Sequence, residues 1–301
     1  MFNGGRKGKL FLLCVLSELT GVVGPSGAQH VAGSFTAETV GQGPHLIFLA
    51  DMGCPPSVYA PFVDSLKKHY TCHLLWIAGF AGTQPSGSDH LLEHIKNDLA
   101  FYVRERQLDR PVLIGHGYGA LAALWMATQE PNLIGGLLVV NALPFQPAAT
   151  QPQLSAQMAA PVAKRRQQQL LMFTDEQFEQ YQRQRAATVV NDVRHQQQFV
   201  HWMKSSDRAT LAKATFELMT LDLREQLQYL QAPVLVLIAA GGLVDPTVRT
   251  SLLSIFQDQY RLAGAVEFSV HDQSRHFIML DDPDWFLSQL GKLLSAQSGR
   301  N

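Results

Sequence analysis

A glycine-rich pentapeptide, Gly115 to Gly119, is the part of the sequence that points most directly to chemistry. It follows the apolar run Pro111 to Ile114 and precedes an amphipathic run from Ala120 to Ala127, which predicts a sharp turn from a strand into a helix. In the pattern G-x-S-x-G, such a turn presents a serine for covalent catalysis. Gly117 stands at the serine position, so the sequence predicts the turn without its nucleophile.

Three further segments resemble those of a known superfamily, in the same order along the chain. They are the G-F-A-G turn at Gly79 to Gly82, the A-L-P-F segment at Ala142 to Phe145, and the H-F-I-M-x-D-D-P segment from His276 to Pro283. Together with the glycine-rich turn, they make the chain resemble the α/β-hydrolase superfamily, specifically an exported bacterial branch. The resemblance implies an α/β-hydrolase fold, an ester or acyl hydrolase lineage and no cofactor.

The resemblance also implies a histidine base and an acid that orients it. His276 follows the last expected strand and Asp245 follows an earlier one, in the chain order nucleophile, acid, histidine. The carboxylate would fix the imidazole tautomer and stabilise the imidazolium that forms. Asn141 ends another strand, at a second place for the acid, but its amide carries no charge. Asp245 is therefore the expected acid.

Two backbone amides, those of Met52 and Tyr118, are the oxyanion-hole donors that the resemblance implies. Asp51 stands where the superfamily normally has a glycine. An ionised carboxylate about 5 Å from a developing oxyanion costs roughly 3 kcal/mol at an effective dielectric near 20. The side chain of Asp51 could instead point away and cap a loop. Facing the oxyanion, it would act with Gly117 against ester hydrolysis.

Three functional interpretations follow. In the first, the protein is a degenerate hydrolase that keeps its fold and pocket and binds a ligand or has no chemistry left. In the second, His276 and Asp245 act directly as a general base on water or on a bound acid, as in cofactor-free lyases and oxygenases of this fold. In the third, Cys54 or Asp51 substitutes as the nucleophile, although the turn serves to aim its own central residue at the histidine.

Apolar strand patterns alternate with amphipathic helices, which predicts a mostly parallel sheet flanked by helices. The expected strands are His45 to Asp51, His73 to Ala78, Pro111 to His116, Gly136 to Ala142, Pro233 to Ala239 and Ala265 to His271. The expected helices are Ser57 to Tyr70, His90 to Gln107, Tyr118 to Gln129, Thr247 to Tyr260 and Trp285 to Gln297. The strands are nearly continuous apolar runs, which indicates burial on both faces.

The composition changes between Pro144 and about Glu225, where Gln, Ala, Met and Arg dominate and no strand pattern occurs. A capping box at Thr174 to Gln177 and an N-cap at Ser206 predict helices. By resemblance, residues 144–225 form a lid on a core of residues 29–143 and 226–301. The lid would cover a pocket for a small hydrophobic or ester-like ligand. Five large side chains are candidates to line it or to pack the lid onto the core: Phe173, Phe178, Phe199, Trp202 and Met203.

The first 28 residues are typical of a signal peptide. Basic residues precede the apolar run Leu10 to Leu16, and Ser26 to Ala28 supplies small residues for cleavage. Export to the periplasm or secretion, without stable membrane insertion after cleavage, is expected. The alternative is an uncleaved anchor, but the run is short and is followed by Glu18, whereas a spanning helix needs about 20 apolar residues.

Composition excludes some partners. The 301 residues carry a formal net charge of −1 without a basic stripe, so nucleic acid is not an expected partner. His90 and His94 share a helix face without a third ligand, and no metal site is expected.

Cys54 and Cys72 fall at opposite ends of neighbouring parallel strands, about 17–20 Å apart. A disulfide tolerates a Cα separation of only about 7 Å, so two free thiols are predicted.

Overall fold

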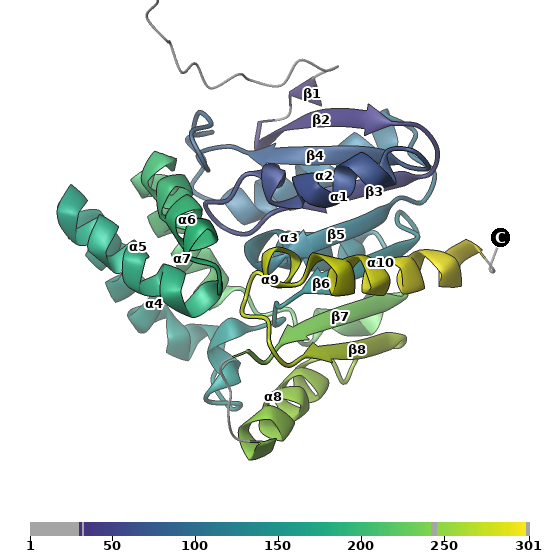
Figure 1. Cartoon of the computed structure of the whole chain (residues 1–301). Helices are drawn as coiled ribbons and strands as arrows, with labels where there is room; N and C mark the ends of the chain where they lie inside the picture. The colour runs from purple at the N-terminus through teal and green to yellow at the C-terminus, as the bar shows by residue number, and fades with distance from the viewer. Residues whose placement is uncertain (1–29, 32, 242–245, 299–301) are drawn as a thin grey trace, which may run out of the picture.

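The computed structural model describes residues 30–31, 33–241 and 246–298, and a mostly parallel sheet forms its centre (Figure 1). Within these residues the sheet has eight strands in the order β1-β2-β4-β3-β5-β6-β7-β8. The strands are β1 His30–Val31, β2 Phe35–Gly41, β3 His45–Leu49, β4 Thr71–Ile77, β5 Val112–His116, β6 Gly136–Val140, β7 Val234–Ala239 and β8 Val266–His271. The predicted signal peptide and Asp245 lie outside the described residues.

Helices cover both faces of the sheet. The α-helices are α1 Ala60–Leu66, α2 Leu91–Glu105, α3 Gly117–Gln129, α4 Ala156–Met172, α5 Asp175–Val189, α6 Val193–Ser205, α7 Arg208–Thr220, α8 Pro246–Gln259, α9 Ile278–Asp281 and α10 Pro283–Ser298. Short 3-10 helices span Pro56–Tyr59, Gln146–Ala149 and Gln226–Tyr229. Helices α1 and α10 lie on one face of the sheet, and α2 and α3 pack together on the other (Figure 1).

The six expected strands are confirmed to within two residues at each end, and β3 to β8 are parallel. Every residue of β5 and β6 is buried, as their continuous apolar sequences predict. Strands β1 and β2 were not expected. Strand β2 runs antiparallel to β4 and lies between β4 and the edge strand β1, and its alternation of apolar and polar residues is the signal of a half-buried strand.

Four helices, α4 to α7, are inserted between β6 and β7, over the carboxyl ends of the parallel strands (Figure 1). The capping box is confirmed, because the Thr174 side chain accepts from the Gln177 amide while Gln177 reaches back to the amide of Thr174. The N-cap prediction at Ser206 is wrong. Asp207 caps α7 by accepting from the Thr210 amide, and Ser206 instead bonds the Ala81 amide of the core. Both residues can cap a helix; the core contact decides between them.

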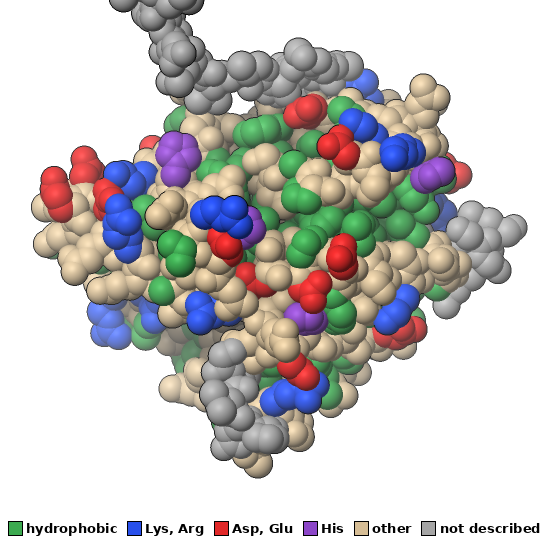
Figure 2. Space-filling model, viewed as in Figure 1, with side chains coloured by type: hydrophobic (Ala, Val, Ile, Leu, Met, Phe, Trp, Pro, Cys, Tyr) green, Lys and Arg blue, Asp and Glu red, His purple; other side chains and the backbone are tan. Residues whose placement is uncertain are grey.

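Charged side chains of both signs are mixed on the surface of the protein (Figure 2). On the face shown in Figure 2, Lys and Arg side chains are interspersed with Asp and Glu. Cys54 and Cys72 are both buried free thiols, as predicted. Within the described ranges, no helix combines the length and apolar character needed to cross a membrane.

Candidate active site

Four residues that follow separate strands meet at the carboxyl end of the parallel sheet. Asp51 follows β3, Gly117 follows β5, Asn141 follows β6 and His276 follows β8. Because β3, β5, β6 and β8 belong to the parallel part of the sheet, their carboxyl ends lie at the same edge. The structure therefore brings Gly117 and His276 together as expected, with Asp51 between them.

Gly117 makes the turn from β5 into α3 with a positive φ of 51°. A Cβ atom at this position would lie 2.1 Å from Oδ1 of Asp51 and 2.4 Å from its Cγ. Real Cβ atoms essentially never show contacts so short, so any side chain here must displace the carboxylate. The carboxylate of Asp51 thus occupies the space of an elbow side chain.

The Asp51 carboxylate is held at both oxygens. Oδ1 accepts the backbone N–H of Tyr118 at 2.7 Å, and Oδ2 accepts from Nε2 of His276 at 2.9 Å. Burial raises the pKa of Asp51, but the hydrogen bonds from His276 and from the Tyr118 amide outweigh it and hold the pKa well below its usual value. Asp51 does not point away, and it takes up the Tyr118 amide that an oxyanion would need.

The orientation of Asn141 fixes the tautomer of His276. Oδ1 of Asn141 accepts the N–H of Ala239 at 3.1 Å, which turns its Nδ2 towards Nδ1 of His276 at 2.7 Å. An amide NH₂ only donates, so Nδ1 is the acceptor and the ring proton is on Nε2. Nε2–H then donates to Asp51. In a catalytic triad the proton is on Nδ1 and Nε2 is the free base, so this tautomer is the reverse of the one needed.

Asn141 carries no charge and is therefore not the expected acid, yet among the described residues its amide is the partner of Nδ1 of His276. Its place at the end of β6 was the signal. Asp245, the predicted acid, lies outside the described residues, and its role stays a prediction.

His116 supports the histidine loop from within the core. It is fully buried, its ring centroid lies 4.3 Å from that of His276, and its Nε2 donates to the His276 carbonyl oxygen at 3.0 Å. Burial and the neighbouring His276 lower the pKa of His116 to about 3, so its ring is neutral. Its Nδ1 has no hydrogen-bond partner among the described residues.

A metal ion would find suitable donor types here. Asp51, His116 and His276 each offer a ligand atom, and these atoms lie within 4.8 Å of one another. Two imidazoles and a carboxylate suit divalent transition metals. Binding would, however, replace the hydrogen bond between Asp51 and His276, and Nε2 of His116 is engaged by a carbonyl. The absence of a metal stays a prediction from the sequence.

Cys54 is poorly suited to act as a nucleophile. Its thiol is buried and donates to the carbonyl of Met52 at 3.8 Å. Burial and then the charge of Asp51 raise the pKa of Cys54 well above its usual value. The reactive species is the thiolate, so this environment suppresses its formation.

Two adjoining cavities open at the site. The first, the site cavity of about 390 Å³, is lined by Asp51, Gly117, Asn141 and His276. The second, the insertion cavity of about 590 Å³, lies among α4 to α7. Five residues line both: Met52, Gln146, Ala149, Arg185 and Leu218. A ligand could therefore extend from one cavity into the other.

The five predicted pocket residues divide into two groups. Phe178 and Met203 line the insertion cavity. Phe173, Phe199 and Trp202 line neither cavity and pack the insertion instead. Phe199 packs edge-on against Phe277, and Phe173 packs against Tyr181. Sequence patterns identify large apolar side chains without showing whether a cavity or another helix lies beside them.

Glu217 ties the insertion to the elbow helix. It accepts from the Tyr118 hydroxyl at 2.6 Å and from the Leu92 N–H at 3.3 Å. Burial raises the pKa of Glu217, and these hydrogen bonds only partly offset the effect. The link joins α7 to the start of α3, beside the amide that Asp51 holds.

Comparisons with known proteins agree on the fold. A family model described as the alpha/beta hydrolase family matches residues 46–289. The chain is 25% identical over 254 residues to a pimeloyl-[acyl-carrier protein] methyl ester esterase of Vibrio vulnificus, covering 84% of this chain and 95% of that protein. It is 30% identical over 203 residues to the Citrobacter koseri protein of the same name, covering 66% and 76%.

Solved structures give the same result. A hydrolase from Pseudomonas aeruginosa superposes with a TM-score of 0.73 at 14% identity, covering 89% of this chain and 99% of the other. The enol-lactonase from Burkholderia xenovorans superposes with a TM-score of 0.69 at 14% identity and the same coverage. The likeness shows a shared α/β-hydrolase fold.

The crowding at Gly117 generates a stability prediction. Gly117→Ala should destabilise the protein by about 2–4 kcal/mol, because a Cβ strains the positive φ and displaces the Asp51 carboxylate. In an Asp51→Gly background the same change should cost only the strain, about 1–2 kcal/mol. Urea unfolding measures both. Gly82→Ala is the control, since Gly82 has a φ of 88° and open space around it. Equal costs of Gly117→Ala in both backgrounds would contradict the geometry.

The raised pKa of Glu217 generates a prediction about pH. A carboxyl group whose pKa is raised by folding contributes stability at low pH and loses it as pH rises through the folded pKa. The melting temperature of wild type should therefore fall relative to that of Glu217→Gln as the pH rises from below the ordinary glutamate pKa of 4.5 to neutral pH. Glu93→Gln, on an exposed position of α2, is the control. A gap between wild type and Glu217→Gln that stays constant over this range would refute the prediction.

Proposed function

Because the chain belongs to the alpha/beta hydrolase family, we propose that it is a ligand-binding member that has kept the fold and its cavities but not serine-esterase chemistry. One observation carries the proposal. The Asp51 carboxylate fills the space of a side chain at Gly117 and holds the Tyr118 amide. The nucleophile and an oxyanion-hole donor are thus lost together.

Ester hydrolysis through an acyl-enzyme needs both of these elements. The oxyanion of the tetrahedral intermediate is stabilised by N–H groups that are free when it forms. Here an ionised carboxylate occupies the Tyr118 N–H and would repel the oxyanion. Loss of a triad nucleophile leaves only about 10³–10⁴-fold catalysis over water, and that remainder depends on the oxyanion hole. The site therefore lacks the group that would attack the ester and disfavours the oxyanion that would form.

The proposal includes a lid and an acyl ligand. Residues 144–225 act as the lid, which is supported by the insertion cavity among α4 to α7. The curated relatives are named for a methyl ester of an acyl chain, which supports an acyl compound as the ligand class. Export, predicted from residues 1–28, is part of the same proposal, and those residues lie outside the described part of the chain.

A second candidate function uses Asp51 and His276 as an acid–base pair. It is favoured by their 2.9 Å contact on the wall of the site cavity. The tautomer set by Asn141 leaves Nε2 of His276 protonated, so the ring starts as an acid and Asp51 is the only base of the pair. The low pKa of Asp51 makes it a weak base, and the binding function is the better account.

Substitute nucleophiles receive less support. Both oxygens of Asp51 are engaged in hydrogen bonds, and its attack on an ester would need the same Tyr118 N–H that it occupies. The Cys54 thiol is buried and kept protonated.

A serine-directed fluorophosphonate probe tests the absence of a nucleophile. Wild type should show no covalent labelling by mass spectrometry and no turnover of short p-nitrophenyl esters above background, because no serine is presented at the turn. An active serine esterase of the same family is the positive control. Stoichiometric labelling would contradict the proposal, and the mass spectrum would identify the labelled residue.

Rebuilding the triad tests how far the site has changed. The double variant Asp51→Gly, Gly117→Ser should gain little esterase activity, because Asn141 still holds His276 in the wrong tautomer. Adding Asn141→Asp should raise kcat by a factor on the order of 10³–10⁴, since an aspartate reverses the tautomer. The carboxylate introduced by this change can keep the bond from the Ala239 N–H through one oxygen and accept from Nδ1 of His276 through the other.

Two controls complete the experiment. His276→Ala in the triple variant should abolish the gain, and Asn141→Asp alone should produce no esterase. If the double variant is already fully active and Asp245→Asn removes that activity, Asp245 is the acid and the role assigned to Asn141 is wrong. Turnover in wild type that collapses in His276→Ala but not in Cys54→Ala would favour the acid–base pair.

A further inference from the structure

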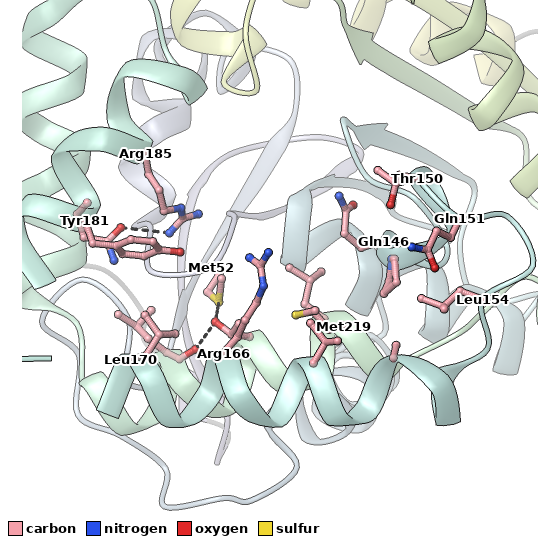
Figure 3. Close-up of a pocket in the computed structure, with 18 of the residues that line it drawn as sticks. Met52, Gln146, Thr150, Gln151, Leu154, Arg166, Leu170, Tyr181, Arg185 and Met219 are labelled. Carbon is pink, nitrogen blue, oxygen red and sulfur yellow. Dashed lines mark hydrogen bonds between the residues drawn. The ribbon is translucent and has the colours of Figure 1, made fainter. Parts of the chain in front are cut away.

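Two arginines without acid partners face the insertion cavity. Arg166 of α4 and Arg185 of α5 both line it, and Figure 3 shows both guanidinium groups directed into its space. No carboxylate of the described residues lies within ion-pair distance of either arginine. Most other arginines of the insertion are different: Arg183, Arg194 and Arg208 each form such a pair.

Arg185 is held in place as a binding group. Its Nη1 donates to Oε1 of Gln182 at 3.1 Å, and Gln182 is 1% exposed. The guanidinium also lies 5.5 Å from the Phe199 ring and 5.9 Å from the Tyr181 ring. A guanidinium has five N–H donors in a rigid fork, so this support leaves several donors for a ligand.

The rest of the insertion cavity is largely apolar. The apolar side chains of its wall include those of Met158, Val162, Leu170, Phe178, Met203 and Leu218. Arg185 is half-buried beside this surface, and a cation so placed without a counter-ion is poorly compensated by the protein alone. A bound anion with an apolar body would satisfy both the charge and the wall.

Asp51 sets the direction in which such a ligand lies. It is ionised and lines the site cavity, so it repels an acidic group placed beside it. Arg185 lines both cavities and attracts the same group. The acidic end of the ligand is therefore directed to the arginines and away from Asp51.

We propose that the insertion cavity binds the carboxylate of a medium-chain monocarboxylic acid, with Arg185 as the principal anion-binding residue and Arg166 assisting from the mouth of the cavity. The proposal rests on the ligand-binding function proposed above and gives that function its ligand class. The planar fork of Arg185 matches the two oxygens of a carboxylate. The apolar wall takes the alkyl chain, and a cavity of about 590 Å³ has room for it.

Isothermal titration calorimetry with sodium hexanoate, octanoate and decanoate tests the proposal on the full chain. Wild type should bind at least one of these acids, and should bind it roughly 10- to 100-fold more tightly than its methyl ester, which lacks the charge. Arg185→Met should weaken binding of the acid by a similar factor and leave binding of the ester nearly unchanged. Arg185→Lys should fall between Arg185→Met and wild type, because lysine keeps the charge but loses the fork.

Arg165→Gln is the matched control, because Arg165 neighbours Arg166 on α4 and does not line the cavity. It should bind the acid as wild type does, while Arg166→Gln should weaken binding by a few-fold. Thermal melting without ligand establishes that each variant is folded. Failure of wild type to bind any of the three acids, or equal effects of Arg185→Met and Arg165→Gln, overturns the proposal. Binding of the methyl ester alone overturns the carboxylate assignment and leaves the proposed binding function standing, whereas ester hydrolysis by wild type would refute that function instead.

Discussion

The pair of hydrogen bonds at the Asp51 carboxylate is the constraint on which the rest of the site depends. One oxygen holds the Tyr118 N–H at the start of α3, and the other holds Nε2 of His276 at the end of β8. The carboxylate therefore connects two loops that a catalytic serine would otherwise connect. Its position requires that residue 117 has no side chain, because a Cβ there would lie 2.1 Å from Oδ1. A serine at 117 and the present position of Asp51 exclude one another.

Much of the fold could be predicted from the sequence because the pattern of apolar residues along a strand or helix reflects which of its faces are buried. Strands β5 and β6 are continuous apolar runs and are buried throughout, and the strand-to-helix turn at Gly117 lies where the glycine pattern places it. Strand β2 was missed because its apolar residues alternate with polar ones, in contrast to the continuous apolar runs of β5 and β6. The cap of α7 was placed one residue early, since Ser206 and Asp207 have similar capping ability and only the tertiary contact of Ser206 with Ala81 separates them.

The candidate site could be predicted only in part, for a different reason. The residue types at the strand ends are visible in the sequence, but what they do depends on hydrogen-bond direction. The sequence predicts no acid at Asn141 because its amide is uncharged, whereas its contact with Ala239 turns its NH₂ towards His276 and so determines the tautomer. Asp51 was expected about 5 Å from an oxyanion or pointing away, whereas it takes the oxyanion's own donor. Distances of this kind are set by four strands together and cannot be read from any one of them.

The departures at 51, 117 and 141 are mutually consistent, which argues for a site rebuilt around a new network rather than a triad that has lost only its serine side chain. Glycine at 117 makes room for the Asp51 carboxylate, and Asn141 supplies a donor to Nδ1 that keeps the His276 proton on Nε2, where Asp51 accepts it. A carboxylate at 141 would pull that proton to Nδ1 and leave Nε2 with a lone pair facing Asp51, two acceptors in contact unless the ring gained a second proton. The neutral amide removes this conflict. Among the described residues that line both cavities, Arg185 is the one cation, and this position is what supports the proposal of an anionic ligand.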